Sequence, residues 1–209
     1  MENFILETKK LSFNGIINYK DIQIIKNKAN FIVGKSGTGK STLLRLFNGT
    51  LSPSSGKIIY SKNDINEMDT IDLRKEVLLI SQSVYLFDGS IKENFQQFYN
   101  YRDLTPPTKE EMKYFLDLCC VPFSLDSNCA IMSGGERQRI YIAIFLSLKP
   151  KVLMLDEPTS ALDKQNSNNV MENIISYCKE NDITVVVVSH DGNITEKFAD
   201  NIITIGDDN

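Results

Sequence analysis

Residues 30–42, which read NFIVGKSGTGKST, contain the feature that decides the fold. Residues 30–33 form a short apolar run, typical of a buried strand, that leads directly into a glycine-rich turn. Residues 41–47 follow with leucines and a phenylalanine at helical spacing, which predicts a helix with one face toward a core. A strand, a glycine-rich turn and a helix in this order predict a phosphate-binding loop within an α/β fold.

The turn matches the pattern G-x-x-x-x-G-K-[ST] at every position. Glycines at these positions let backbone N–H groups surround phosphate oxygens, while Lys40 reaches the β- and γ-phosphates and the Ser41 hydroxyl coordinates Mg²⁺. A turn without any ligand is the alternative, and the full match between a strand and a helix disfavours it. The predicted nucleotide-binding residues are Gly34, Lys35, Ser36, Gly37, Thr38, Gly39, Lys40, Ser41 and Thr42.

The rest of the chain alternates strand-like and helix-like segments. Apolar or alternating runs predict strands at residues 4–13, 22–25, 57–60, 77–80, 152–155 and 183–188, with a turn at 53–56. A helix is expected over 134–148, and residues 84–131 form a small helical insert with one amphipathic helix near 109–120. The continuous apolar runs at 152–155 and 183–188 are typical of a buried parallel sheet, which again predicts an α/β fold.

Three polar residues follow predicted buried strands. Asp156 and Glu157 end the stretch VLMLDE, and His190, the only histidine, ends ITVVVVSH. Asp156 is suited to hold Mg²⁺, and Glu157 to act as the general base that polarises an attacking water. Solvated loop acids and an ordinary polar histidine are the alternatives. Because ligands bind at the carboxyl ends of strands in open α/β sheets, we expect these residues to face the phosphate loop.

A second candidate anion site lies at Ser133, Gly134 and Gly135, in the stretch MSGGERQR. These residues open the helix predicted over 134–148, where free backbone N–H groups and the helix dipole favour a negative ligand. The chain therefore carries two phosphate-type sites about a hundred residues apart in sequence.

The overall composition limits the classes of function. The net charge is −4 and the pI is about 5.1, which argues against a nucleic-acid-binding protein. No leader segment is expected from the first residues, and the longest apolar runs fall far below the roughly 20 residues of a membrane span, so any span would belong to another chain. The four cysteines form no CxxC pair and are interpreted as free thiols.

Taken together, these motifs resemble the nucleotide-binding ATPase subunit of ABC transporters over essentially the whole chain. The resemblance implies an α/β P-loop NTPase of ABC type, with a mostly parallel central sheet, N-terminal antiparallel strands and a short helical subdomain. It implies one domain over 1–209, with the core in 1–82 and 136–209 and the helical insert in 83–135. Residues 34–41 are similar to the Walker A loop, 152–156 to the Walker B strand, 133–135 to the signature and 160–163 to the D-loop.

The resemblance also assigns roles. Gln82 is similar to the glutamine that contacts Mg²⁺ or the attacking water and couples to the membrane partner, Glu157 to the catalytic base, and His190 to the switch histidine at the γ-phosphate. The implied ligands are ATP and Mg²⁺, with Ser41, Gln82 and Asp156 near the metal. Two copies are expected to pair head to tail, so that Ser133, Gly134 and Gly135 of one copy complete the nucleotide site of the other.

The implied partner is a separately encoded membrane permease, which would place the chain on the cytoplasmic face of the membrane. Residues 85–95 resemble exporters, and the insert resembles a small bacterial group that includes an iron-efflux system. A soluble ABC ATPase acting on ribosomes, DNA or cluster assembly is the alternative. The chain departs from the family in Glu136 of the signature, where glutamine is commoner, and in its adenine-stacking aromatic, for which Phe13 and Tyr19 are both candidates.

Overall fold

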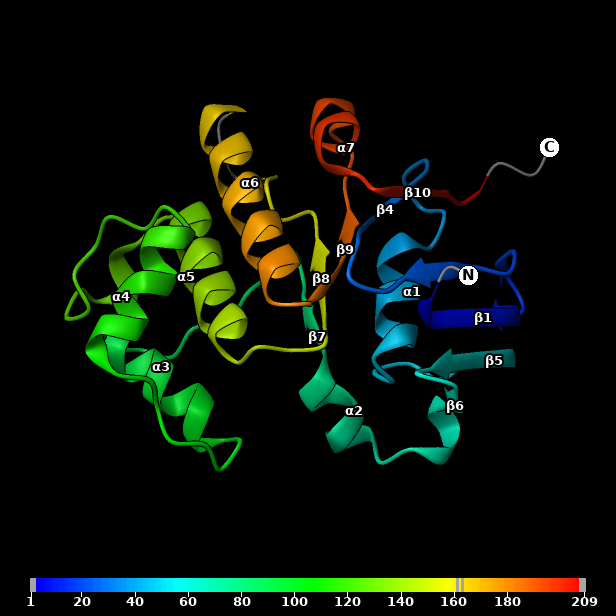
Figure 1. The fold of residues 1–209 in the computed structure, drawn as a ribbon, viewed down its shortest axis with the longest axis horizontal. Coiled ribbons are helices and arrows are strands. Elements are labelled where there is room, and N and C mark those ends of the chain that lie inside the picture. Colours follow the sequence, from blue (N-terminus) through cyan, green and yellow to red (C-terminus); the bar gives the residue numbers. More distant parts are fainter. Residues whose placement is uncertain (1–2, 161, 163, 207–209) are drawn as a thin grey trace.

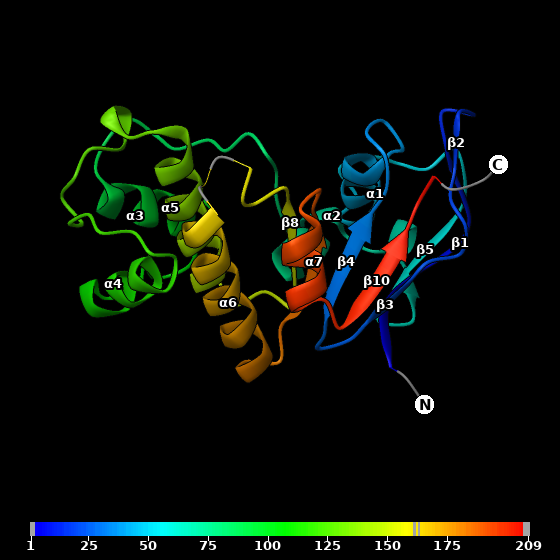
Figure 2. The same cartoon turned by 90° about the horizontal axis from the view of Figure 1, so that it is seen from above.

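The structure is a computed structural model that describes residues 3–160, 162 and 164–206. Within these residues the strands form two sheets, with helix α1 (Lys40–Phe47) between them. Figures 1 and 2 show helices α3 (Ile91–Asn100), α4 (Lys109–Leu118) and α5 (Gly134–Ser147) at one end of the molecule and the antiparallel strands at the other. The parallel sheet lies between these two ends.

The central sheet is parallel throughout. Its order is β10 (Asn201–Thr204), β4 (Ala29–Val33), β9 (Thr184–Val188), β8 (Val152–Asp156) and β7 (Val77–Ile80). The register pairs Val188 with both Ile32 and Asp156, so the carboxyl ends of the three middle strands lie level at one edge. This agrees with the prediction of a mostly parallel sheet whose strand ends come together.

The second sheet is antiparallel and includes the N-terminal strand. It contains β1 (Phe4–Phe13), β2 (Ile17–Asn18), β3 (Gln23–Ile25), β5 (Ser55–Tyr60) and β6 (Asn63–Asp64). The turn predicted at 53–56 was wrong for its last two residues, because Ser55 already pairs with Ser12 of β1. The register shifts between Lys9 and Ser12, and Gly56 at φ 84° fits the bulge where no side chain has room.

Two hydrophobic cores lie on opposite faces of the central sheet. Leu153 and Leu155 of β8 face one core with α5 and α6 (Lys164–Glu180), while Val152 and Met154 face the other with α1 and the antiparallel sheet. This alternation follows from the period of two in a strand. Both faces of β8 are thus buried, which explains why its sequence is continuously apolar.

Several elements were not predicted from the sequence. They are the short strands β2 and β6, strand β10, helices α2 (Thr70–Glu76), α3, α6 and α7 (Gly192–Phe198), and two short 3₁₀ turns (Ile65–Glu67 and Cys129–Ile131). Helix α6 begins with a polar stretch, and Val170 and Met171 are its first buried apolar side chains among the described residues. In α3 a fully buried Asn94 interrupts the apolar face.

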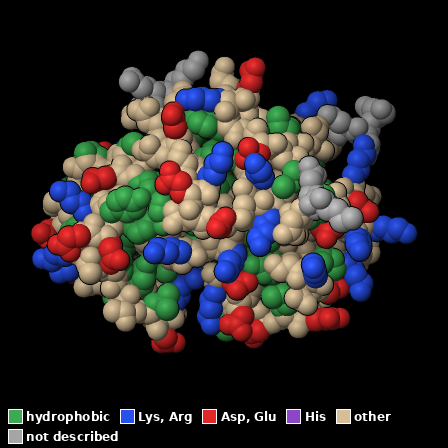
Figure 3. Space-filling view, in the orientation of Figure 1, with side chains coloured by type: hydrophobic (Ala, Val, Ile, Leu, Met, Phe, Trp, Pro, Cys, Tyr) green, Lys and Arg blue, Asp and Glu red, His purple; other side chains and the backbone are tan. Residues whose placement is uncertain are grey.

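The surface in Figure 3 mixes charged side chains of both signs. Among the described residues on this face, no broad area carries a single sign of charge. In the part of the chain that the structure describes, none of the helices combines the length and the apolar character that crossing a membrane requires.

Candidate active site

The glycine-rich loop connects β4 to α1. Its backbone packs against Ile205 and is closed by a hydrogen bond within the loop. Gly34, Gly37 and Gly39 all have positive φ angles, at 152°, 81° and 93°, which side chains with a Cβ rarely adopt. A Cβ on Gly34 would overlap the carbonyl of Ile205, just after β10. The Thr38 hydroxyl donates to the Lys35 carbonyl at 2.9 Å, which closes the turn. The exposed Ser36 lies within the turn, and Thr42 in the first turn of α1.

Lys40 lies inside this loop with only 5% of its surface exposed. Its ammonium group donates to the carbonyls of Gly34 and Lys35, both at 2.8 Å. Burial lowers the pKa of Lys40, and the nearby carboxylates of Glu157 and Asp156 act in the opposite direction. The loop thus curls around a cation that sits beside free backbone N–H groups at the start of α1.

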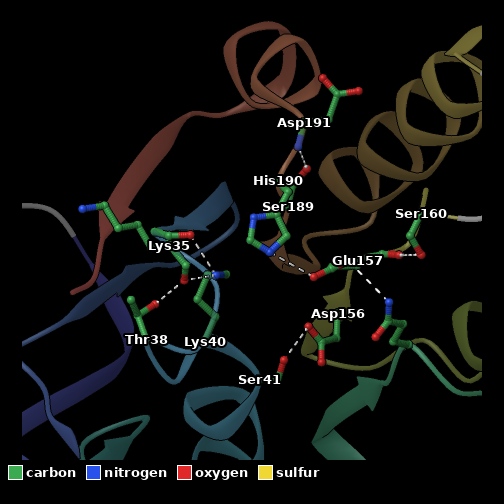
Figure 4. A network of polar contacts seen from close by, with 12 residues as sticks. Lys35, Thr38, Lys40, Ser41, Asp156, Glu157, Ser160, Ser189, His190 and Asp191 are labelled. Carbon is green, nitrogen blue, oxygen red and sulfur yellow. Dashed lines mark hydrogen bonds and ion pairs between the residues drawn. The ribbon is translucent and has the colours of Figure 1, made fainter. Parts of the chain in front are cut away.

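Ser41 and Asp156 form a pair between the start of α1 and the end of β8. The Ser41 hydroxyl donates to Asp156 Oδ1 at 3.0 Å (Figure 4). Burial raises the pKa of Asp156, and the hydrogen bond from Ser41 partly offsets this effect. A hydroxyl and a carboxylate are the hard oxygen donors that Mg²⁺ takes together with phosphate oxygens, so the pair fits a magnesium ion.

Glu157 connects the ends of three neighbouring strands through its carboxylate. Its Oε1 lies 3.2 Å from Nε2 of His190, which follows β9, and its Oε2 accepts from Nε2 of Gln82, which follows β7, at 3.5 Å. Figure 4 shows His190 and Glu157 pointing toward each other above Asp156 and Ser41. The structure therefore brings Glu157 and His190 together beside the phosphate loop, as expected from their strand ends, and adds Gln82, which the family resemblance had assigned to the site.

The backbone of Glu157 is also fixed. Its φ is 51°, an uncommon value for a residue with a side chain, and its N–H donates to the Val188 carbonyl at 3.0 Å. Its own carbonyl accepts from the buried Gln138 of α5 at 3.4 Å and from the Ser160 hydroxyl at 3.1 Å. Gln138 was not predicted as a site residue. The available signal was a polar side chain among the buried positions of α5.

The signature residues do not join the phosphate loop of their own chain. Ser133 and Gly134 are exposed at the start of α5, and Figures 1 and 2 place α5 and α1 on opposite sides of the central sheet. The Ser133 hydroxyl donates to Glu136 Oε2 at 2.8 Å, and the Ser133 N–H donates to the same oxygen at 2.7 Å. These bonds, the backbone bond first, lower the pKa of Glu136. Glu136, the departure from the common signature, thus caps the helix on which it lies.

Several cavities adjoin the site, and two of them bear on nucleotide binding. One of about 410 Å³ is lined by Glu157, Ser160 and His190, among others. Of the predicted D-loop, residues 161 and 163 lie outside the described residues. A second cavity, of about 580 Å³, lies against Gly37 and Thr38 and is bordered by Ile16, which is 83% exposed. This cavity is large enough for a nucleoside beside the phosphate loop.

Neither predicted aromatic has a free ring over that cavity. Tyr19, one of the two candidates, borders this cavity but is only 6% exposed, and its hydroxyl donates to the Gly39 carbonyl at 2.9 Å. Phe13 is half-buried and packs against the core between the two sheets. The exposed apolar side chain at this place is Ile16, an aliphatic residue.

Comparison with known proteins agrees with this geometry. Residues 18–160 match the family model described as ABC transporter. This chain belongs to the ABC transporter family. An ABC transporter subunit of this kind hydrolyses ATP to power transport, and the described P-loop architecture is that of an ABC ATP-binding subunit.

Several members of the ABC transporter family are similar to this chain over most of its length. The probable iron export ATP-binding protein FetA of Escherichia coli is 36% identical over 91% of this chain and 84% of its own. The phosphate import ATP-binding protein PstB of Saccharolobus solfataricus is 38% identical over 87% of this chain and 76% of its own. The solved structure of cbiO1 from Clostridium perfringens, part of the transporter complex cbiONQ, is 28% identical with a TM-score of 0.84 and covers 98% and 85% of the two chains.

Proposed function

We propose that this ABC ATP-binding subunit binds Mg·ATP on residues 34–42 and Asp156, and hydrolyses it with Glu157 as the general base. The observation that carries the proposal is the Glu157 carboxylate, which Gln82 and His190 hold next to the Ser41–Asp156 pair. A carboxylate fixed at this point accepts the proton of a water aligned for attack on the terminal phosphate. His190 contacts the Glu157 carboxylate, and Lys40 lies inside the phosphate loop. Both side chains are suited to stabilise the terminal phosphate oxygens.

Ser41, Asp156 and Gln82 are the side chains that would hold Mg²⁺. A magnesium ion held by these side chains would supply positive charge to the phosphate oxygens. The Ser41–Asp156 hydrogen bond already sets the two oxygens at 3.0 Å from each other. The nucleoside would lie in the cavity bordered by Ile16, with an aliphatic contact to the base in place of an aromatic one.

The proposed working unit is a head-to-tail dimer of single-domain chains, each with a core in 1–82 and 136–209 and an insert in 83–135. Exposed Ser133 and Gly134 at the start of α5 support this arrangement, because within the described residues they serve no nucleotide of their own chain. In the dimer, Ser133, Gly134 and Gly135 of one copy would contact the terminal phosphate bound by the other.

The proposed partner is a separate membrane permease, with this subunit on the cytoplasmic face of the membrane. The relative cbiO1, described as part of the ABC transporter complex cbiONQ, supports a separate membrane subunit. We propose export of a metal ion, because the probable iron export protein FetA is a relative of this chain. The phosphate import protein PstB, at similar identity, supports the alternative of phosphate import.

The catalytic part is tested with Glu157→Gln. This variant keeps the shape of the side chain but cannot accept a proton, so we expect Mg·ATP binding to persist and steady-state hydrolysis to fall about a hundredfold or more. With Mg·ATP the variant should accumulate as a dimer in light scattering. Glu180→Gln, an exposed site at the end of α6, is the matched control. Hydrolysis at the parent rate would refute the role of Glu157.

The transport part is tested by co-purification. The Glu157→Gln chain is tagged, expressed in its own host and recovered from solubilised membranes in Mg·ATP. We expect a polytopic membrane protein in roughly equal amount, whereas purely soluble or ribosomal partners would contradict the permease. The same complex is then prepared with the parent chain and reconstituted into lipid vesicles. The orientation to be measured is the one in which this subunit lies on the outer surface of the vesicle. ATP-dependent uptake of Fe²⁺ into such vesicles corresponds to export, and transport of phosphate alone would overturn the substrate proposal.

A further inference from the structure

We propose that Tyr19 is a positioning residue for nucleotide binding, because its hydroxyl fixes the peptide between Gly39 and Lys40 in the phosphate loop. Tyr19 follows β2 in the antiparallel sheet, and its hydroxyl contacts the loop at the Gly39 carbonyl. The inference rests on the proposed use of this loop to bind ATP. It assigns to the N-terminal sheet a direct influence on the affinity for phosphate.

The first step is the contact itself. The Tyr19 hydroxyl donates to the Gly39 carbonyl at 2.9 Å, and the backbone N–H of Leu43 donates to the same carbonyl at 2.8 Å. The two donors use both acceptor positions of this oxygen. Gly39 is therefore held by the first hydrogen bond of α1 and by a side chain from another sheet. A carbonyl with two donors resists rotation of its peptide plane more than a carbonyl with one.

The second step follows from the geometry of the peptide bond. In a trans peptide the C=O and the N–H of one unit point in opposite directions. The unit that begins with the Gly39 carbonyl ends with the N–H of Lys40. Because Leu43 and Tyr19 hold the carbonyl on the helix side, the Lys40 N–H points back into the glycine-rich loop. As one of the first N–H groups of α1, it has no acceptor within the helix and is free for a phosphate oxygen.

The third step concerns the lack of space around Gly39. It adopts φ 93°, and a Cβ there would lie 2.7 Å from the Tyr19 hydroxyl oxygen and 3.0 Å from Cδ1 of Ile17. The loop thus packs directly on Tyr19 and Ile17. Burial raises the pKa of Tyr19 to about 12, so its hydroxyl keeps its proton and remains a donor at neutral pH.

The test compares Tyr19→Phe with Tyr60→Phe. Tyr60 in β5 is likewise buried and also loses one hydrogen bond, from its hydroxyl to Glu76 at 2.8 Å, but it does not contact the loop. The dissociation constant for Mg·ATP is measured by titration calorimetry, at a temperature where each chain is folded. We expect Tyr19→Phe to raise this constant about three- to tenfold, the usual effect of one hydrogen bond, and Tyr60→Phe to leave it unchanged.

Thermal unfolding without nucleotide separates positioning from support of the fold. Both variants should lower the midpoint by similar amounts, since both remove one buried hydroxyl. An unchanged dissociation constant for Tyr19→Phe, or its failure to fold while Tyr60→Phe folds, would assign the hydroxyl to the fold and overturn the inference. If the parent chain itself does not bind Mg·ATP, the proposed function is refuted. If the parent chain binds Mg·ATP and Tyr19→Phe binds it equally well, only the inference about Tyr19 is refuted.

Discussion

Lys40 shows how one side chain organises the phosphate loop. Its ammonium group already bonds the carbonyls of Gly34 and Lys35, so the loop is closed around it. In the proposed function, a phosphate would bind this cation without a large rearrangement, since the ammonium group is buried and already in place.

Replacing Lys40 with alanine should therefore weaken Mg·ATP binding by tenfold or more, because the loop loses both its cation and the donor that orders two carbonyls. Titration calorimetry measures the effect, and Lys9→Ala, an exposed site on β1, serves as the control. Equal affinity of parent and Lys40→Ala would contradict the assignment of the loop.

Individual site residues differed in how well they could be predicted. Asp156, Glu157 and His190 each follow an apolar strand, and parallel strands bring their ends together, so their proximity followed from the sequence. Tyr19 was considered only as one of two candidate stacking aromatics, its contact with Gly39 was not predicted, and Gln138 was not considered. Their partners, Gly39 and Glu157, lie about twenty residues away in the chain, and no local pattern specifies such contacts.

At the scale of elements, three helices begin with the same reciprocal cap. The pairs are Ser90 with Glu93 in α3, Thr108 with Glu111 in α4, and Ser133 with Glu136 in α5. Each follows the pattern S/T-x-x-E, which is readable in sequence. The start of α3 could thus have been found from its cap, although its buried Asn94 obscured the apolar face.

The cap of α3 predicts a dependence on pH. Hydrogen bonds to Ser90, the backbone bond first, lower the pKa of Glu93 below its ordinary 4.5. A carboxylate with a lowered folded-state pKa adds stability above the unfolded value and loses it as the pH falls through the folded value. Glu93→Gln should therefore flatten the decline of the unfolding free energy below about pH 4.5, measured by urea titration at several pH values.

The matched control for this experiment is Glu110→Gln, at an exposed position in the first turn of α4 outside its capping box. Curves for parent and Glu93→Gln that stay parallel from pH 6 to about pH 3 would exclude a contribution from this cap.

At the scale of the whole molecule, Asn30 joins the two sheets. It is fully buried in β4, accepts from the Ile25 N–H of the antiparallel sheet and from Asn201 of β10, and donates to the Ile25 carbonyl, each at 2.9 Å. Its amide thus satisfies backbone groups where β3 approaches the central sheet. The sequence indicated both sheets but not this connection, because a single asparagine at the start of an apolar run has many possible partners.

Asn30→Ala should lower the free energy of unfolding by about 3 kcal/mol, since it leaves partly buried backbone groups of Ile25 without partners. Denaturant unfolding followed by circular dichroism measures the change. Asn100→Ala, at the exposed end of α3, should change it by less than about 0.5 kcal/mol. Equal effects at the two positions would mean that Asn30 is not the connection described.

The start of α5 already holds an anion of its own, the Glu136 carboxylate on the hydroxyl and N–H of Ser133. In the proposed dimer, a phosphate from the second copy takes these donors from Glu136, so assembly exchanges one negative group for another. The gain comes from the greater charge of the phosphate, and salt reduces it. In that proposed dimer, a ligand with a single negative charge would gain little from this exchange, so the chain itself would set the charge that a nucleotide must carry to draw two copies together.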